Sequence, residues 1–346
     1  MSWFKSGGNK PKRPEAPSSA PVSGAAGADG AADPFAALAE RPVPAVLADL
    51  FLALEEHLNE LELEDVRRLV ATVRQPLALV DRLTGGLDDP DELRDAILSS
   101  PTLSADVLRV VNSAAFPLRN PISSIEHAVT YLGATMGKGL VLQSLVTQIM
   151  DFDTDVQKTA YMRIWRGSHI ASTTAHAYAK HLGLASPSIY ATRALLVNVG
   201  DLALVSARPE LAVIYAPKTS LLTRVENQQR ELMANSAVLS AMLAREWGLP
   251  EDLYVALRHS LTPLTWAPDN NERSPDSQCE DVLLYLACRV GDAVTYRGLE
   301  DARDYDVLAD ESPDVFYLPA YLKKLGLESL LDVPRDVKYA QRFAGS

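Results

Sequence analysis

The hydrophobic positions of this chain recur at the spacing of helices, and the clearest pair of helical patterns lies between Ser99 and Gly133. Apolar residues three or four positions apart share one face of a helix. The first pattern begins at Pro101, since proline suits the first helical position. Its apolar residues are Leu103, Val107, Leu108 and Val111. This helix should end before Pro117, because the residue that precedes a proline is disfavoured in the helical region.

A second helix is predicted directly after this proline-bounded stretch. Ser123 and Glu126 stand at the spacing of a capping box, in which each side chain bonds a backbone N–H of the other residue. Apolar residues then follow along one side, and we expect Gly133 to end the helix. These residues are Ile125, Ala128, Val129 and Leu132. The two helices should form a hairpin with the sequence VNSAAF at its turn.

Further helical patterns flank this hairpin on both sides. The segment from about Val46 to Leu61 is amphipathic, and Asp89 followed by Pro90 gives a clear helix start. Near the other end of the chain, an apolar stripe can cover a neighbouring helix: Leu283, Leu284, Leu286, Ala287, Val290 and Val294. We find neither an alternating strand pattern nor an internal repeat, so we predict an all-α body from about residue 35 to the end.

Residues 1–33 differ from the rest in composition. Four basic residues lie near the start, namely Lys5, Lys10, Lys12 and Arg13. A run of Ala, Pro, Gly and Ser follows them. Such a segment cannot bury enough apolar surface to offset its ordering entropy, so we expect a disordered tail. Trp3 and Phe4 could touch a membrane surface or a partner, and an inert tail is the simpler interpretation.

The composition is that of a soluble globular protein, with 47% hydrophobic and 23% charged residues. We find neither the run of about 20 apolar residues that a membrane-spanning helix needs nor the hydrophobic centre of a signal peptide. We therefore expect a cytoplasmic protein without a membrane span. The net charge of −12 repels phosphates and argues against binding of nucleic acid. Cys279 and Cys288 match neither a zinc spacing nor a redox spacing, so we interpret them as reduced thiols.

The string NSAAF, followed by NPISSIEHAVTYLG, strongly resembles the HDOD family, an all-helical relative of the HD-domain metal phosphohydrolases found in bacterial signalling proteins. The resemblance runs from about Arg74 into the 260s. It implies an HD-like helical bundle with additional N-terminal and C-terminal helices. The residues of the structural motif are Asn112, Ser113, Phe116, Ile122, Ser123 and Gly133. For Asn112 we expect hydrogen bonds to the backbone of the following loop rather than contact with a ligand.

This resemblance also divides the chain. The tail at 1–33 precedes amphipathic helices at 34–72, the HDOD domain at 73–265 has a front part at 73–150 and an HD-like part at 155–265, and a C-terminal helical extension follows at 280–346. The polar and acidic sequence DFDTDVQK is the expected hinge between the two parts of the domain.

HD-type hydrolases hold one or two metals with a histidine, an adjacent His-Asp pair and usually further histidines. In WRGSHIAS the family's histidine position falls on Gly167, and in ALLVNVGDLAL its His-Asp pair becomes Val197 and Asn198. A later histidine position falls on Ser236, so that only His259 remains. A catalytic metal needs about three protein ligands. The resemblance therefore implies no catalytic residue, no metal and no cofactor, and it leaves these five positions as a candidate groove for a ligand or partner.

The other histidines do not have the spacing of a metal site. His169 and His176 share a helix face, but two turns separate them by roughly 10 Å along the axis. His57 lies among glutamates, which is typical of a solvated helix face. The sequence ATMGKG lacks the spacing of a phosphate-binding loop.

Three functions remain open from the sequence. The first is a non-enzymatic signalling protein that acts on other signalling proteins as an interaction or relay module, with a homo-oligomer left open. The second is a metal-dependent phosphohydrolase of a nucleotide or cyclic dinucleotide, with displaced ligands such as His169 and Asp201. The third is a sensor that holds a small ligand in the degenerate pocket without turnover. A bound metal would distinguish the second function, and stabilisation by a nucleotide would distinguish the third.

Overall fold

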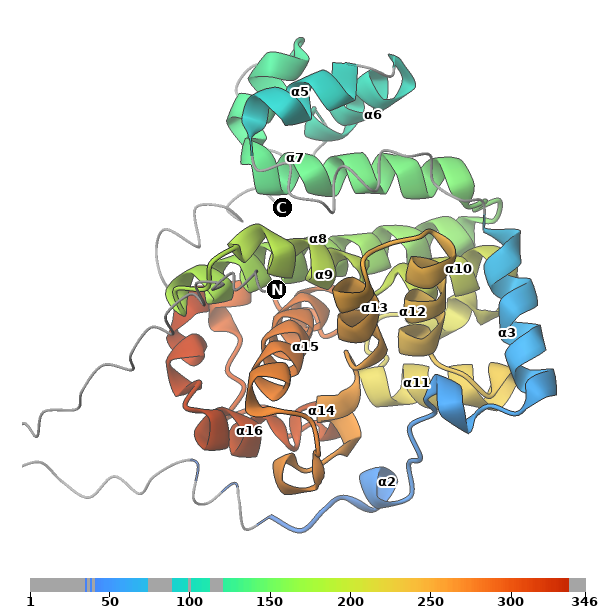
Figure 1. Cartoon of the computed structure of the whole chain (residues 1–346), viewed down its shortest axis with the longest axis vertical. Helices are drawn as coiled ribbons and strands as arrows, with labels where there is room; N and C mark the ends of the chain where they lie inside the picture. Colours follow the sequence, from blue (N-terminus) through green and yellow to red (C-terminus); the bar gives the residue numbers. More distant parts are fainter. Residues whose placement is uncertain are drawn as a thin grey trace, which may run out of the picture. The chain divides into compact units, whose positions relative to one another are not determined.

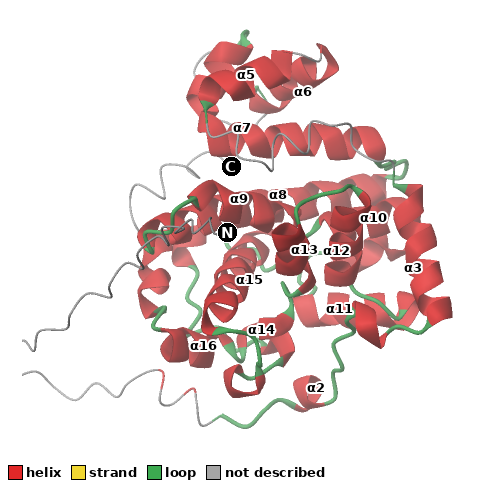
Figure 2. Cartoon of the chain, in the orientation of Figure 1, coloured by secondary structure: helices red, strands yellow, loops and turns green. Residues whose placement is uncertain are grey.

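Helices and loops make up the part of the chain that the structure describes, and no strand occurs there (Figure 2), which confirms the predicted all-α class. The computed structural model describes Phe35, Leu38 and residues 41–73, 89–98, 101–112 and 121–335. The predicted tail at 1–33 lies outside the described residues.

Figure 1 shows the order of the helices along the chain. The α-helices are α2 (Ala45–Ala48), α3 (Glu60–Thr72), α5 (Pro90–Leu98), α6 (Pro101–Val111), α7 (Ile125–Ile149), α8 (Asp155–His181), α9 (Pro187–Leu196), α10 (Val199–Ala207), α11 (Leu221–Leu232), α12 (Ser236–Glu246), α13 (Glu251–Arg258), α14 (Thr262–Thr265), α15 (Pro275–Thr295) and α16 (Leu318–Leu325). Short 3-10 helices are η1 (Glu55–His57), η2 (Pro209–Tyr215), η3 (Pro268–Asn270), η4 (Ala302–Asp304), η5 (Pro313–Val315) and η6 (Glu328–Arg335).

The first helix of the predicted hairpin is confirmed, since α6 begins at Pro101 and buries Leu103, Val107 and Val111. The expected role of Asn112 is also confirmed. Its Nδ2 donates to the carbonyl oxygen of Ile122 at 2.7 Å, and the N–H of Ile122 donates to its Oδ1 at 2.7 Å. This exchange of two hydrogen bonds fixes the end of α6 to the start of the next helix. The other two motif residues in the turn, Ser113 and Phe116, lie outside the described residues.

The start of the second helix differs from the prediction, whereas its end agrees with it. The cap is Ser124 rather than Ser123, because Ser124 directly precedes the first helical residue and its Oγ accepts from the N–H of His127 at 3.2 Å. Gly133 adopts φ 70° and ψ 168°, a conformation that glycine adopts without steric cost. One helix therefore ends at Gly133, as predicted, and a second helical part of α7 follows it.

The amphipathic helix predicted from Val46 to Leu61 is wrong. Helix α2 ends at Ala48, and α3 begins only at Glu60. The intervening residues Leu52, Ala53 and Leu54 are consecutive and all buried, which a helix with one apolar face would not allow. A new helix starts at Glu60 because the Oδ1 of Asn59 accepts from two backbone N–H groups of its first turn.

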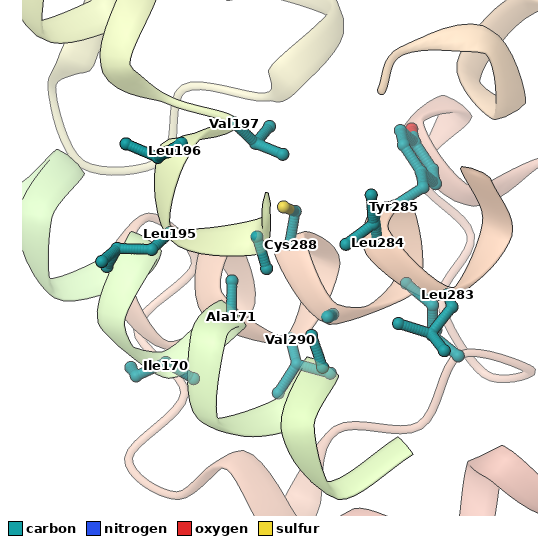
Figure 3. Packing of buried hydrophobic residues seen from close by; sticks show 14 of the residues in the cluster. Ile170, Ala171, Leu195, Leu196, Val197, Leu283, Leu284, Tyr285, Cys288 and Val290 are labelled. Carbon is teal, nitrogen blue, oxygen red and sulfur yellow. The ribbon is translucent and has the colours of Figure 1, made fainter. Parts of the chain in front are cut away.

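The long helices α8 and α15 pack side by side, and α9 packs against α8. The apolar stripe predicted on α15 is confirmed, since none of its six residues is more than 8% exposed. Figure 3 shows Leu283, Leu284 and Val290 of this stripe within the cluster. Residues from Pro34 onward group into one unit, so the expected C-terminal extension supplies a central helix of the core.

One helical segment in the described part, Pro187–Ala207, is long and apolar enough to cross a membrane. It comprises α9 and α10, and 72% of its most apolar stretch of 18 residues is buried inside the body. Such burial is typical of a core helix, so the segment is weak support for a membrane span.

Candidate functional site

Gly167, at the first of the HD metal positions, lies where α8 crosses α15. A Cβ placed on Gly291 of α15 would lie 2.4 Å from the carbonyl oxygen of Gly167, far inside van der Waals contact. A Cβ placed on Gly167 itself would lie 3.2 Å from the Oγ1 of Thr295. The two helices therefore meet backbone to backbone, and a side chain at position 167 would press on the side chain of Thr295 in α15.

Val197 and Asn198, at the family's His-Asp pair, join α9 to α10. Val197 is buried in the same apolar cluster as Ala171 and Cys288, and Figure 3 shows these three side chains gathered between α9, α8 and α15. The Nδ2 of Asn198 donates to the Oγ of Ser168 at 3.0 Å. Helix packing therefore uses both positions, Val197 in the apolar cluster and Asn198 in a hydrogen bond to α8.

Ser236, at the later histidine position, begins α12 and packs against α10. Its backbone N–H donates to the Oε1 of Gln228 at 2.9 Å. A Cβ on Gly200 would lie 2.3 Å from the carbonyl oxygen of Ser236, so these two backbones are also in contact. The first four predicted positions thus lie on adjoining, tightly packed helices.

His259, the remaining histidine, follows α13 and is half-buried. Its Nδ1 lies 3.5 Å from the Oγ1 of Thr262. Burial, with the positive charges of Arg273 and Arg258, lowers its pKa to about 4, so the ring is neutral at pH 7. The described contacts of His259 lie at the α13–α14 corner, and none joins it to the other four positions.

The displaced ligands suggested for a hydrolase, His169 and Asp201, face different helices. Both ring nitrogens of His169 are buried without a hydrogen-bond partner, and the ring lies towards Gly139 of α7 and Leu195 of α9. Asp201 accepts from the hydroxyl of Tyr215 at 2.7 Å and from Gln228 at 2.8 Å. Burial raises the pKa of Asp201 despite these bonds. The structure does not bring the two candidate ligands to one point.

A buried charged cluster between α11 and α15 was not predicted from the sequence. Arg224 and Arg289 both donate to the carboxylate of Asp292, and Arg289 does so at 2.9 Å. Burial alone would raise the pKa of Asp292, but the two guanidinium groups outweigh it and lower that pKa. The guanidinium of Arg224 also lies 4.0 Å from the ring centroid of Tyr296. The pairing of Arg289 with Asp292 could have been predicted from their spacing on one helix face, whereas the approach of Arg224 from α11 could not.

As donors, the residues at the HD metal positions do not fit a divalent metal. Glycine and valine offer no side-chain lone pair, Asn198 and Ser236 hold a neutral amide and a neutral hydroxyl, and His259 supplies a single imidazole. Across the described residues, no three side chains of His, Cys, Asp or Glu come together in a way that could hold a metal ion.

Comparison with known proteins gives a family and a fold. A family model described as HDOD domain matches residues 80–263. An HDOD domain protein with unknown function from Geobacter sulfurreducens is 18% identical in sequence, with a TM-score of 0.50 over 79% of this chain and 97% of that chain. A Marinobacter aquaeolei VT8 protein named for signal transduction is 15% identical, with a TM-score of 0.54 over 86% of this chain and 65% of that chain. A Shewanella amazonensis SB2B protein named as a phosphohydrolase is 20% identical, with a TM-score of 0.48 over 81% of this chain and 98% of that chain. None of the curated proteins matches this chain.

At such low identity the solved structures support the fold alone. The family model spans more than half of the sequence. It includes the hairpin that Asn112 fixes, and the helices that carry Gly167, Val197 and Ser236. This chain belongs to the HDOD domain family.

Proposed function

We propose that this chain is a non-enzymatic regulatory protein of the HDOD family, which acts as an interaction or relay module for other signalling proteins in the cytoplasm. The observation that carries the proposal is the contact between Gly167 and Gly291. It places two helix backbones against each other at a position where an HD hydrolase would need a metal-binding histidine.

The chemistry of the neighbouring positions supports the same proposal. Val197 contributes to the apolar core, and the side-chain Nδ2 of Asn198 donates a hydrogen bond to the Oγ of Ser168. A catalytic metal needs about three protein ligands and an open position for water. Restoring such a shell would require new donors and new space at once, and a packed protein interior resists such a change.

Metal content and hydrolysis, measured on the same preparation, test the proposal. The full chain is purified without chelator, its divalent metals are quantified, and hydrolysis of bis(p-nitrophenyl) phosphate and of a cyclic dinucleotide is followed with added Mn²⁺. We expect no stoichiometric metal and no turnover above the protein-free rate, with or without EDTA.

The variants His169→Ala and Asp201→Asn distinguish the competing hydrolase from a contaminating enzyme. Stoichiometric metal, together with EDTA-sensitive turnover that either variant abolishes, would overturn the proposal. Turnover that both variants retain at the wild-type rate would identify a contaminant and leave the proposal supported.

A further inference from the structure

The N-terminal segment of residues 45–58, called the strap below, is fixed to the body by side chains far away in the sequence. The Oε1 of Gln229 accepts from the N–H of Ala53 at 2.8 Å, while its Nε2 donates to the carbonyl oxygen of Phe51 at 2.8 Å. Asn235 donates to the carbonyl oxygen of Ala53, also at 2.8 Å. Glu55 accepts from Arg245 at 2.7 Å. In Figure 1 the strap runs from α2 past α11 to α3. These bonds hold its backbone in one position, so a surface built on it is preorganised.

Phe51 stands at the point where the strap borders two cavities. One has a volume of about 450 Å³ and the other about 500 Å³, and Leu50, Phe51 and His57 line both. The side chain of Phe51 is 63% exposed, and its ring centroid lies 4.8 Å from that of His57. Met233, which is 53% exposed, lines the second cavity. A large exposed aromatic ring and thioether beside a hollow are typical of a surface that binds another protein.

The charges of the second cavity select the kind of partner. Asp49, Glu62 and Glu226 line it, and Arg230 is the cation among its lining residues. In a symmetric dimer the same patch meets itself, so two patches with three carboxylates and one guanidinium each, both net negative, would face each other. Such a pairing is unfavourable, particularly in a chain of net charge −12. A segment with Lys or Arg beside an apolar residue complements both the carboxylates and the apolar side chains of the cavity.

We propose that the second cavity, here called the Phe51 groove, binds a basic and apolar segment of a partner protein. The segment inserts a large apolar side chain next to Phe51 and Met233, and it presents Lys or Arg to Asp49, Glu62 and Glu226. This inference rests on the proposed function as an interaction module and names its surface and the chemistry of its partner.

Two fluorescein-labelled amphipathic peptides of about 12 residues test the groove by anisotropy with the full chain. They share the same leucine positions, and one carries Lys and the other Glu at the polar positions. We expect saturable binding of the Lys peptide and none of the Glu peptide. The double variant Asp49→Lys/Glu226→Lys should weaken binding about tenfold or more, because it reverses the attraction. Phe51→Ala and Met233→Gly should each weaken it about fivefold through lost apolar contact.

Controls make the result specific to the groove. Glu300→Lys/Glu311→Lys changes the net charge by the same amount at exposed residues that line neither cavity. It should alter the affinity less than about threefold. Met233→Gly should keep the fold, since Met233 has φ 57° and glycine accepts that conformation. Matching thermal melts of all variants show that the fold is kept.

Three outcomes would overturn the inference. They are no saturable binding of the Lys peptide, equal weakening by the control pair, and a dimer in sedimentation experiments that Phe51→Ala dissociates. The last outcome would assign the groove to a second copy of the chain. None involves a metal or a phosphoester, so the inference can fail while the proposed function stands, and metal-dependent turnover can overturn that function without changing peptide binding.

Discussion

The carbonyl oxygen of Gly167 lies so close to Gly291 that a single methyl group between them would overlap it, since a Cβ on Gly291 would be 2.4 Å away. Helices α8 and α15 can approach this closely only because Gly291 has no side chain. The contact joins a helix of the family-matched region to one beyond it. It therefore determines both the stability of the core and the chemistry that position 167 can support.

Gly291→Ala should lower the free energy of unfolding by about 1–3 kcal/mol, because the added methyl group forces α8 and α15 apart. The matched control is Gly139→Ala in α7, where a Cβ would meet its nearest neighbours at 3.7 Å, an ordinary contact distance. That change should be neutral or slightly stabilising, since alanine favours helix. Urea unfolding of both variants measures the difference, and equal effects would refute the close contact.

Ser124→Ala should cost about 1 kcal/mol of stability, because it removes the hydroxyl that accepts from His127 at the start of α7. Ser123→Ala, one residue earlier, should change the stability by less than about 0.5 kcal/mol, as expected for an exposed position without a capping role. Chemical denaturation of the two single variants compares them directly. A larger loss for Ser123→Ala would restore the capping box read from the sequence.

Asp292→Asn should destabilise the protein by about 3–5 kcal/mol, because it leaves the buried charges of Arg224 and Arg289 uncompensated. The comparison is Asp301→Asn, which breaks a more exposed pair with Arg303. Its cost should not exceed about 1 kcal/mol. Thermal and urea unfolding report both values, and similar losses would show that the buried cluster contributes no more than a surface pair.

His169 should make the protein less stable in mild acid. Burial lowers its pKa to about 4, below the ordinary value of 6.5, so the folded form keeps the ring neutral while the unfolded chain gains a proton. The contribution of the neutral His169 ring to the free energy of unfolding is therefore complete above pH 6.5, and it is lost as the pH drops towards 4. His169→Leu removes this term and should lose about 1–2 kcal/mol less between pH 7.5 and 5 than the wild type. A wild-type slope in His169→Leu would contradict the assignment.

Local signals allowed much of the fold to be predicted. Pro101 began a helix and Asn112 bonded the loop backbone, because proline geometry and side-chain amide chemistry act over a few residues. The strap was mistaken for a helix because its partners are remote, with Gln229 lying 176 residues from the Ala53 that it bonds. Tertiary hydrogen bonds there outweigh the apolar periodicity of the segment.

The same limit applies to the candidate site. The replaced HD positions could be read one by one, since each depends on residue identity alone. The packing of α15 beside Gly167 could not be predicted, because Gly291 lies far away in the sequence and no local pattern says where this helix packs. The groove beside Phe51 was missed for the same reason, because it forms only when the strap meets α11.

The position of α15 also defines how much of the gene product is needed for a folded unit. A fragment trimmed to the family match would end at residue 263 and lose this helix. The faces of α8 and α9 that α15 covers would then meet water, and chains with such surfaces tend to aggregate. Truncation studies and domain fusions on this protein should therefore retain the sequence through η6.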